Sequence, residues 1–289
     1  MRYDTFMPGQ KSGTKLRIGI VGCGAIGGSL ARIVREEFGG KMRVSALFDL
    51  RAENASALAG RLHIAAKTAV ARDLKALIKA SDLVVEAASA SASYAIACEC
   101  LKAGRSVMVM SVGGIVDRVE LLAREAERSG ARIYVPSGAL AGIDALKAAG
   151  GARSARLKSV TLTTIKNPAS FSGVDYLRRR KIDPAGINKD TVLFDGRAEK
   201  AVRCFPQNIN VAAVLSLAGL GARATRVRII ASPCVKKNIH EVRIESDAAV
   251  ITTRTENVPH PENRKTSYLA VLAAAAVLRQ IISPVSVGT

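Results

Sequence analysis

The sequence has no tryptophan, and only 4% of its 289 residues are aromatic. Proteins that bind single-stranded nucleic acid or sugars by stacking need aromatic platforms, so the composition disfavours that class of function. The five cysteines form an odd number without a C-x-x-C pair, which argues against a disulfide framework and a zinc site. We therefore expect no metal, and we expect buried free thiols of a protein in a reducing cytoplasm, at Cys23, Cys98, Cys100, Cys204 and Cys234.

The sequence also lacks a long apolar run. The longest apolar stretch, Tyr268 to Leu278, is too short to span a bilayer. Residues 1–15 have no apolar core of the kind that a signal peptide requires. We expect a polar amino-terminal tail over residues 1–15, a cytoplasmic location and no membrane partner.

Negative charge is scarce, with 24 Asp and Glu against 43 Lys and Arg and a formal net charge of +19. Such an excess either attracts an anionic partner or belongs to a solvated basic surface. The densest run, Arg178 to Lys181, is short and is soon followed by Asp183-Pro184, as at a loop or a helix end. Because no nucleic-acid-binding motif accompanies the charge, we expect no nucleic-acid partner, and we expect the charge to favour an anionic small-molecule substrate.

Short apolar strands alternate with helical segments over the first half of the chain. This alternation predicts a parallel, doubly wound α/β sheet of the Rossmann type. The expected strands are 18–21, 43–48, 82–87, 106–110 and 131–135. The first expected helix follows the glycine-rich turn after the first strand, and the others cover 52–62, 72–79, 91–103 and 119–129.

The pattern changes beyond about residue 150, where polar and apolar residues alternate at period two over 158–164, 227–231, 240–245 and 249–254. Such strands have one buried and one solvated face, which favours a second α+β domain with a largely antiparallel sheet. Helices are expected over 210–217 and from about 266 to 282. We predict a dinucleotide-binding domain over 16–140 and 266–289 and a catalytic and dimerisation domain over 141–265.

A glycine fingerprint lies between the first strand and the first helix. Gly22, Gly24 and Gly27 form G-x-G-x-x-G, in which they permit a tight turn, a close approach to a pyrophosphate and close helix–strand packing, respectively. The helix amino terminus then offers unpaired N–H groups to the phosphates. Asp49 ends the next strand, where a carboxylate accepts hydrogen bonds from the adenosine ribose. The predicted cofactor contacts are Gly22, Gly24, Ala25, Ile26, Gly27 and Asp49.

The cofactor is expected to be NAD, and Arg51, two residues after Asp49, leaves NADP open. The third strand is followed by Glu86-Ala87-Ala88-Ser89, where small residues leave room for the nicotinamide ribose, so Ala88 and Ser89 are added to the cofactor contacts. For Glu86 itself, a carboxylate that caps a helix is an equal alternative.

Three polar segments in the second half identify a family. They are SGALAGIDAL (137–146), FPQNINVAA (205–213) and NVPHPENRKTS (257–267). Together with GIVGCGAIG, they resemble the L-aspartate dehydrogenase family, and the resemblance covers nearly the whole chain after the tail. It implies a Rossmann domain followed by an α/β domain whose sheet supports a homodimer. It also implies NAD(P)-dependent, reversible deamination of L-aspartate to iminosuccinate or oxaloacetate and ammonia, with a hand-off of the imine to an enzyme of NAD synthesis left open.

Matched motif by motif, the family's catalytic histidine corresponds to His240, and its cofactor contacts correspond to Ala139 and Asn210. Many members carry an arginine after the T-T of the first strand of the second domain, where this chain has Ile165, and a proline where it has Arg264.

The chemistry requires a proton acceptor, because the substrate amine must be neutral before hydride leaves and a water must then be activated to attack the imine. A histidine that titrates near neutrality serves both steps. Of the three histidines, we assign His240 to catalysis, expect His63 at the surface and place His260 in a rigid substrate-binding loop. The predicted substrate-binding residues are Asn208, His260, Asn263, Lys265, Thr266 and Ser267.

Two other classes of function compete with this assignment. A homoserine-dehydrogenase-like or dihydrodipicolinate-reductase-like enzyme would share the fold, but the paired lysine and acid of the former and the histidine-rich motif of the latter cannot be placed in the sequence. A non-catalytic dinucleotide sensor that binds nucleic acid would require a recognisable binding motif. Two measurements distinguish the enzyme from the nucleic-acid-binding sensor: the formation of NADH with aspartate, and the retention of the protein on DNA in moderate salt.

Overall fold

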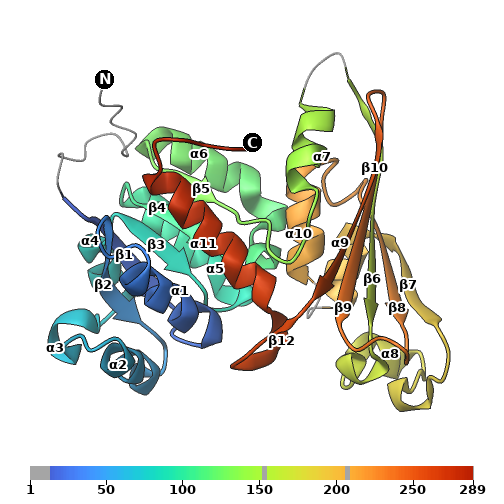
Figure 1. Ribbon diagram of the computed structural model, residues 1–289, viewed down its shortest axis with the longest axis horizontal. Coiled ribbons are helices and arrows are strands. Elements are labelled where there is room, and N and C mark those ends of the chain that lie inside the picture. Colours follow the sequence, from blue (N-terminus) through green and yellow to red (C-terminus); the bar gives the residue numbers. More distant parts are fainter. Residues whose placement is uncertain (1–13, 152–154, 206–208, 289) are drawn as a thin grey trace. The chain divides into compact units, whose positions relative to one another are not determined.

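The computed structural model describes residues 14–151, 155–205 and 209–288, which form two compact units (Figure 1). The first unit contains the chain up to Pro136 together with Val271–Val287, and the second contains Ser137–Ala270 and Gly288. The second unit therefore interrupts the first before its last helix.

The first unit is built on a parallel five-stranded sheet in the order β2-β1-β3-β4-β5. Its strands are β1 (Leu16–Val21), β2 (Met42–Phe48), β3 (Leu83–Glu86), β4 (Ser106–Val109) and β5 (Ile133–Tyr134). β3 and β4 are buried at every residue, which explains why these strands read as unbroken apolar runs and not as alternating ones. The parallel Rossmann-type sheet predicted from the sequence is confirmed.

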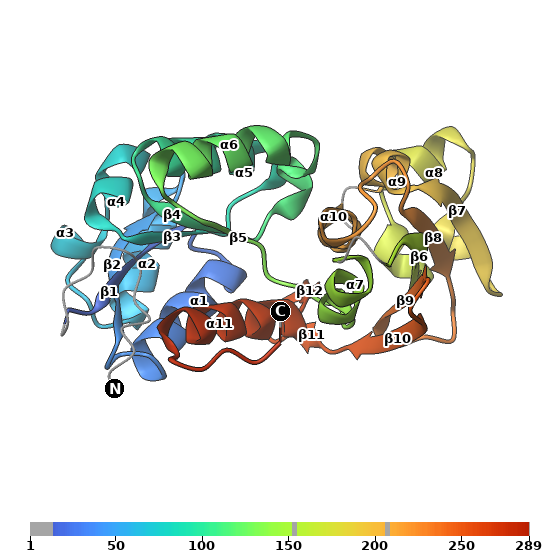
Figure 2. The same cartoon turned by 90° about the horizontal axis from the view of Figure 1, so that it is seen from above.

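Helices cover both faces of this sheet. Figure 2 shows α1 (Ala25–Glu36) and α11 (Tyr268–Ile282) on one face and α4 (Leu74–Ala80), α5 (Ala90–Lys102) and α6 (Val119–Ser129) on the other. α2 (Ala52–Arg61) and the short α3 (Ala66–Ala69) follow β2. Val271, Ala274 and Leu278 of α11 are buried in the same core as Leu30 of α1, so the last helix packs onto the first unit.

The second unit contains a five-stranded sheet in the order β10-β9-β6-β8-β7. Its strands are β6 (Leu157–Lys166), β7 (Thr191–Arg197), β8 (Arg226–Ala231), β9 (Asn238–Ser246) and β10 (Val250–Asn257). All neighbours are antiparallel except β6 and β8, which run parallel, so the sheet is mixed. A two-stranded ribbon of β11 (Pro259–His260) and β12 (Asn263–Ser267) leads into α11.

One face of the second sheet is covered by helices α7 (Ile143–Gly150), α9 (Ala198–Cys204) and α10 (Ile209–Ala218), while α8 (Asp175–Arg179) lies near its β7 edge (Figures 1 and 2). Along β6, the side chains of Val160, Leu162, Thr164 and Lys166 are buried, and those between them are only partly buried. Because alternate side chains point to opposite faces, these four residues belong to the helix-covered face and Ile165 to the other.

The free thiols are not all buried, contrary to the expectation from the sequence. Cys23 and Cys100 are buried, Cys98 and Cys204 are partly buried, and Cys234 is exposed. Cys234 lies in the turn between β8 and β9, where the backbone leaves the sheet and no core remains to cover a small apolar side chain.

In the part of the chain that the structure describes, no helix is long and apolar enough to cross a membrane. Among the same residues, no group of three or more histidine, cysteine or acidic side chains is placed to hold a metal ion.

Candidate active site

The glycine loop has two residues that no larger side chain can replace without displacing backbone. Gly22 has φ +89, and a Cβ there would lie 2.4 Å from the carbonyl oxygen of Ala87. A Cβ on Gly27 would lie 1.9 Å from the carbonyl oxygen of Gly22. These two glycines therefore close the turn and seat α1 against β1, as the fingerprint predicted.

Gly24 differs from its two partners in the fingerprint. It is the N-cap of α1, and a Cβ built on it would meet nothing within 4 Å. The first turn of α1 contains Ala25 and Ile26 and no acidic residue, so its N–H groups and partial positive charge face no competing carboxylate from that turn. Open space in front of a helix amino terminus fits a dinucleotide pyrophosphate.

Asp49, directly after β2, is tied to the glycine loop. Its Oδ2 accepts a hydrogen bond from the Cys23 N–H at 2.8 Å, and its Oδ1 accepts from the Arg51 N–H at 3.0 Å and from the Asn54 Nδ2 at 3.1 Å. Burial raises the pKa of Asp49, but these hydrogen bonds and the charge of Arg51 together lower it by more. The pKa of Asp49 therefore lies below its usual value. The carboxylate thus stays ionised and holds the loop. Because a carboxylate has about four acceptor sites, it retains capacity for a ribose hydroxyl.

Glu86, the last residue of β3, is fully buried and organises the neighbouring turns. Its Oε1 accepts from the Ala88 N–H at 2.9 Å, and its Oε2 accepts from the Ser111 N–H at 3.1 Å. Burial raises the pKa of Glu86. The carboxylate thus holds the N–H of Ser111, which is the N-cap of the short 3-10 helix Val112–Gly114, and that of the exposed Ala88 at the carboxyl end of β3.

The predicted cofactor residues of the first unit therefore gather at one edge. Gly22, Asp49 and Ala88 follow β1, β2 and β3, which are neighbours in the sheet. Ligands of open parallel sheets bind at the carboxyl ends of the strands, so this edge is the expected dinucleotide site.

In the second unit, His240 lies on β9 between Thr164 of β6 and Thr255 of β10. Its side chain is 3% exposed, and its Nδ1 lies 3.1 Å from the Thr164 Oγ1. Burial, together with the charge of Lys166, lowers the pKa of His240 to about 3. The ring is therefore neutral in the free protein, whereas the sequence argument expected titration near neutrality.

Ala139 lies beside His240 because the 139–141 segment is fastened to β10. The side chains of Thr255 and Asn257 both donate to the Ala139 carbonyl oxygen at 3.2 Å, and the Thr253 Oγ1 donates to that of Ala141 at 3.0 Å. The Asn257 Oδ1 is buried and has no hydrogen-bond partner among the described residues. The predicted catalytic histidine and one predicted cofactor contact thus share the helix-covered face of the sheet.

The structure describes only some of the remaining predicted site residues. Asn210 is exposed in the first turn of α10, and Asn208 lies outside the described residues. Asn263, Thr266 and Ser267 are half-buried on β12, and the side chain of Lys265 also lies outside the description. Their contacts with substrate stay a prediction.

The two other histidines differ from each other. His63 is exposed, as the sequence predicted. His260 is 2% exposed, its Nδ1 accepts from the Glu262 N–H at 3.1 Å, and its ring packs edge-on against Tyr268. His260 thus holds the turn of the β11–β12 ribbon, and its role in substrate binding stays a prediction.

Lys166 is a residue of this site that the sequence argument missed. It is the last residue of β6, is 9% exposed, and lies two residues after Thr164 on the same face as His240. Burial lowers its pKa to about 8. Ile165 stands where many family members carry an arginine, and it lies on the opposite face of the sheet. The absence of that arginine therefore removes no charge from the side of His240.

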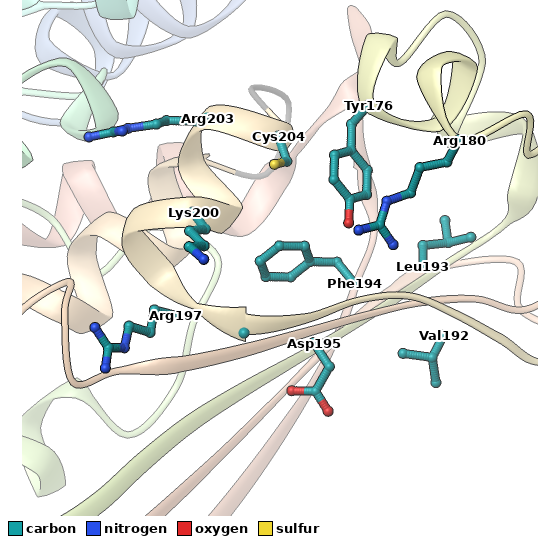
Figure 3. A pocket seen from close by; sticks show the side chains of 11 residues that line it. Tyr176, Arg180, Val192, Leu193, Phe194, Asp195, Arg197, Lys200, Arg203 and Cys204 are labelled. Carbon is teal, nitrogen blue, oxygen red and sulfur yellow. The ribbon is translucent and has the colours of Figure 1, made fainter.

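The second unit also has a cavity of about 810 Å³ between β7, α8 and α9. Figure 3 shows Tyr176 and Phe194 among basic side chains there, and the Arg180 guanidinium lies over the Tyr176 ring, 4.7 Å from its centroid. None of the predicted site residues lines this cavity, so it is separate from the candidate active site.

Two family models match different parts of the chain. Residues 144–281 match the family described as aspartate dehydrogenase, C-terminal, and residues 22–136 match the homoserine dehydrogenase NAD-binding domain. The L-aspartate dehydrogenases of Methanosarcina mazei and Methanosarcina barkeri are 43% and 41% identical to this chain, each over 95% of the chain and 100% of the relative. The crystal structure of an aspartate dehydrogenase from Thermotoga maritima covers 95% of this chain and 100% of its own, with 27% identity and a TM-score of 0.73.

Proposed function

The chain belongs to the L-aspartate dehydrogenase family, and we propose that it catalyses the reversible oxidative deamination of L-aspartate to iminosuccinate, or oxaloacetate after hydrolysis, and ammonia. The observation that carries the proposal is the position of His240, which is buried and held at Nδ1 by Thr164 beside the 139–141 segment. Iminosuccinate that leaves before hydrolysis would be available to an enzyme of NAD synthesis.

The cofactor of the proposed reaction is NAD, with NADP as the alternative that Arg51 admits. The residues predicted to hold it in the first unit are Gly24, the first turn of α1, Asp49, Ala88 and Ser89. Ala139 and Asn210, the cofactor contacts that the family resemblance implies, belong to the second unit. When bound, the oxidised nicotinamide supplies an acceptor for the hydride that leaves the substrate Cα.

His240 would transfer the protons of the proposed reaction. The substrate ammonium must lose a proton before Cα can give up hydride, and the water that attacks the imine carbon must lose one as well. Thr164 occupies Nδ1, and Nε2 forms no hydrogen bond to a described residue, so Nε2 is the ring atom that exchanges these protons. The low pKa keeps the ring neutral before substrate arrives, so Nε2 accepts a proton in the tautomer whose Nδ1–H donates to the Thr164 Oγ1.

A substrate screen tests the proposal. Purified protein is mixed with NAD or NADP and with L-aspartate, L-homoserine, L-alanine or L-glutamate, and reduced nicotinamide is followed by its absorbance. We expect formation of NADH with L-aspartate alone, and release of ammonia in equal amount. Turnover of homoserine, or of none of the four, would contradict the proposed substrate.

We also propose that the enzyme is a homodimer joined through the face of the second sheet that the unit's helices leave uncovered. Ile165 pairs in register with Ile230 of β8 and Ile239 of β9, which places an apolar row across three strands of this face. The row lies among ion pairs of exposed side chains, including Arg226–Asp195 and Arg243–Glu245. An apolar centre with a charged rim is typical of a protein interface.

Analytical ultracentrifugation checks the homodimer. We expect the wild-type protein to sediment at twice the chain mass and Ile230→Asp to sediment as a monomer, because a carboxylate at the centre of the interface would be desolvated without a partner. Lys200→Asp, an exposed substitution on α9, is the control and should remain dimeric. A wild-type monomer at micromolar concentration would contradict the proposal.

A further inference from the structure

Lys166 is a buried cation without a counter-ion among the described residues. Its side chain forms no hydrogen bond or ion pair with the described residues, although it lies at the end of β6 with 9% of its surface exposed. Lysine is rarely buried so deeply unless its charge is paired, because moving an ammonium group out of water is costly. An unpaired buried cation therefore indicates a missing anion.

The carboxylates of the same sheet do not supply that anion. Glu241 and Glu256 pair with Arg254, Glu245 pairs with Arg243, and Asp195 pairs with Arg226. All of these acidic residues alternate with buried ones along their strands and are only partly buried or exposed. They point away from the helix-covered face on which Lys166 lies.

The residues of β9 and β10 near Lys166 are polar. Thr164 and His240 form the adjacent row, and the next row contains Asn238, paired in register with Asn257 of β10. The buried Asn257 Oδ1 is an acceptor that has no donor among the described residues. The same end of one sheet face thus holds a cation without an anion and an acceptor without a donor.

An amino dicarboxylate has the complementary groups. β6 and β10 are separated by two strand spacings, about 10 Å. A carboxylate of a four-carbon amino dicarboxylate can pair with Lys166 while its amine, the group that donates, reaches the Asn257 Oδ1. His240 lies on β9, the strand between β6 and β10, so an amine that donates to Asn257 also lies on the side of His240.

We propose that Lys166 is the residue that binds a carboxylate group of the dicarboxylate substrate, so that substrate itself is the counter-ion of the buried lysine. The proposal rests on the proposed function and deepens it by naming a specificity residue. Burial and, second to it, the charge of Lys166 lower the pKa of His240; carboxylate binding neutralises that charge and thereby makes the histidine a stronger base once substrate is present.

Binding of succinate, an unreactive dicarboxylate, tests this role without reference to turnover. Isothermal titration with the holoenzyme, saturated with NAD, would compare wild type with Lys166→Met, Lys166→Arg and the control Lys158→Met. Lys158 lies on the same strand but is exposed and paired with Asp247. We expect Lys166→Met to weaken succinate binding by about 30-fold or more, because one partner of a buried charge pair is lost, and to raise KM for aspartate similarly. Lys158→Met should change neither, and NAD affinity should be unchanged in both.

The pH dependence of succinate binding supplies a second readout. Lys166 is charged below its pKa of about 8, so wild-type affinity should fall as pH rises through 8, whereas Lys166→Arg should bind to higher pH. The charge of Lys166 acts on His240, which is already neutral in this range. Thermal denaturation is expected to show that Lys166→Met melts at or above the wild-type temperature, because an unpaired buried charge is removed.

The outcomes separate this inference from the proposed function. Succinate affinity that is unchanged in Lys166→Met, or a loss of kcat with unchanged KM, would overturn the role of Lys166. Lys166-dependent binding of succinate by a protein that does not oxidise aspartate would support the carboxylate site and overturn the proposed function.

Discussion

Replacement of His240 by alanine is expected to lower kcat for L-aspartate by about 10²–10⁴-fold, because that is the usual contribution of a positioned general acid or base. NAD affinity should change little, since the predicted pyrophosphate and ribose contacts lie in the first unit. Steady-state kinetics with saturating NAD, together with fluorescence titration of NADH, measure the two quantities separately. The low pKa of the free histidine places its limb of the kcat/KM profile near pH 3, where activity falls as the ring becomes protonated. This limb should disappear in His240→Ala.

His260→Ala is the matched comparison, because both histidines are buried in the second unit. His260 has its Nδ1 committed to the Glu262 N–H, so its removal loosens the β11–β12 ribbon and is expected to act mostly through the KM for aspartate. Aspartate turnover that survives in His240→Ala with an unchanged pH profile would make His240 structural. The search for the base would then move to His260 or Lys265.

The first unit could be predicted closely because its sequence signals are local. The apolar strands, the glycine turn and the start of α1 are each set by neighbouring residues, and the helix predicted over 119–129 is observed as Val119–Ser129. In the second unit, β7, α8 and α9 were not predicted. β7 is an edge strand with a register shift between Val192 and Phe194. The shift interrupts the alternation of buried and exposed residues from which a strand is predicted.

The positions of the site residues depend on contacts that the sequence does not encode locally. Asp49 was predicted as a ribose ligand, but its three hydrogen bonds to the Cys23 and Arg51 N–H groups and to Asn54 show that it also fastens the glycine loop. Glu86 could not be assigned from the sequence, because its partners are the N–H groups of two turns, one of them 25 residues away.

Lys166 was missed because the strand that contains it was expected to end at residue 164. A lysine at a strand end is ordinarily solvated, so its type offered no signal of burial. The signal was its position: Val160, Leu162 and Thr164 continue the same alternation, which places Lys166 on the inward face if the strand runs two residues further. An inward lysine at the end of an otherwise apolar face is the pattern that would have identified it.

The glycine loop offers the second large expected effect, which is the loss of dinucleotide binding in Gly24→Val with the fold intact. Gly24 has φ −75 and ψ −161, a backbone conformation open to other residues, and a Cβ at this position meets no protein atom within 4 Å. The valine methyl groups would instead occupy the space in front of α1 that a pyrophosphate must enter to reach the helix N–H groups. Fluorescence titration should therefore detect no NADH binding at concentrations that saturate wild type.

Gly27→Val is the control for Gly24→Val, because its Cβ would lie 1.9 Å from the Gly22 carbonyl oxygen and force α1 away from β1. This variant should lower the melting temperature, whereas Gly24→Val should melt close to wild type, with at most a small loss from valine at the N-cap. The contrast distinguishes a glycine kept for the ligand from one kept for packing. Wild-type affinity for NADH in a folded Gly24→Val protein would place the dinucleotide away from the glycine loop, since a backbone covered by a β-branched side chain cannot approach a phosphate.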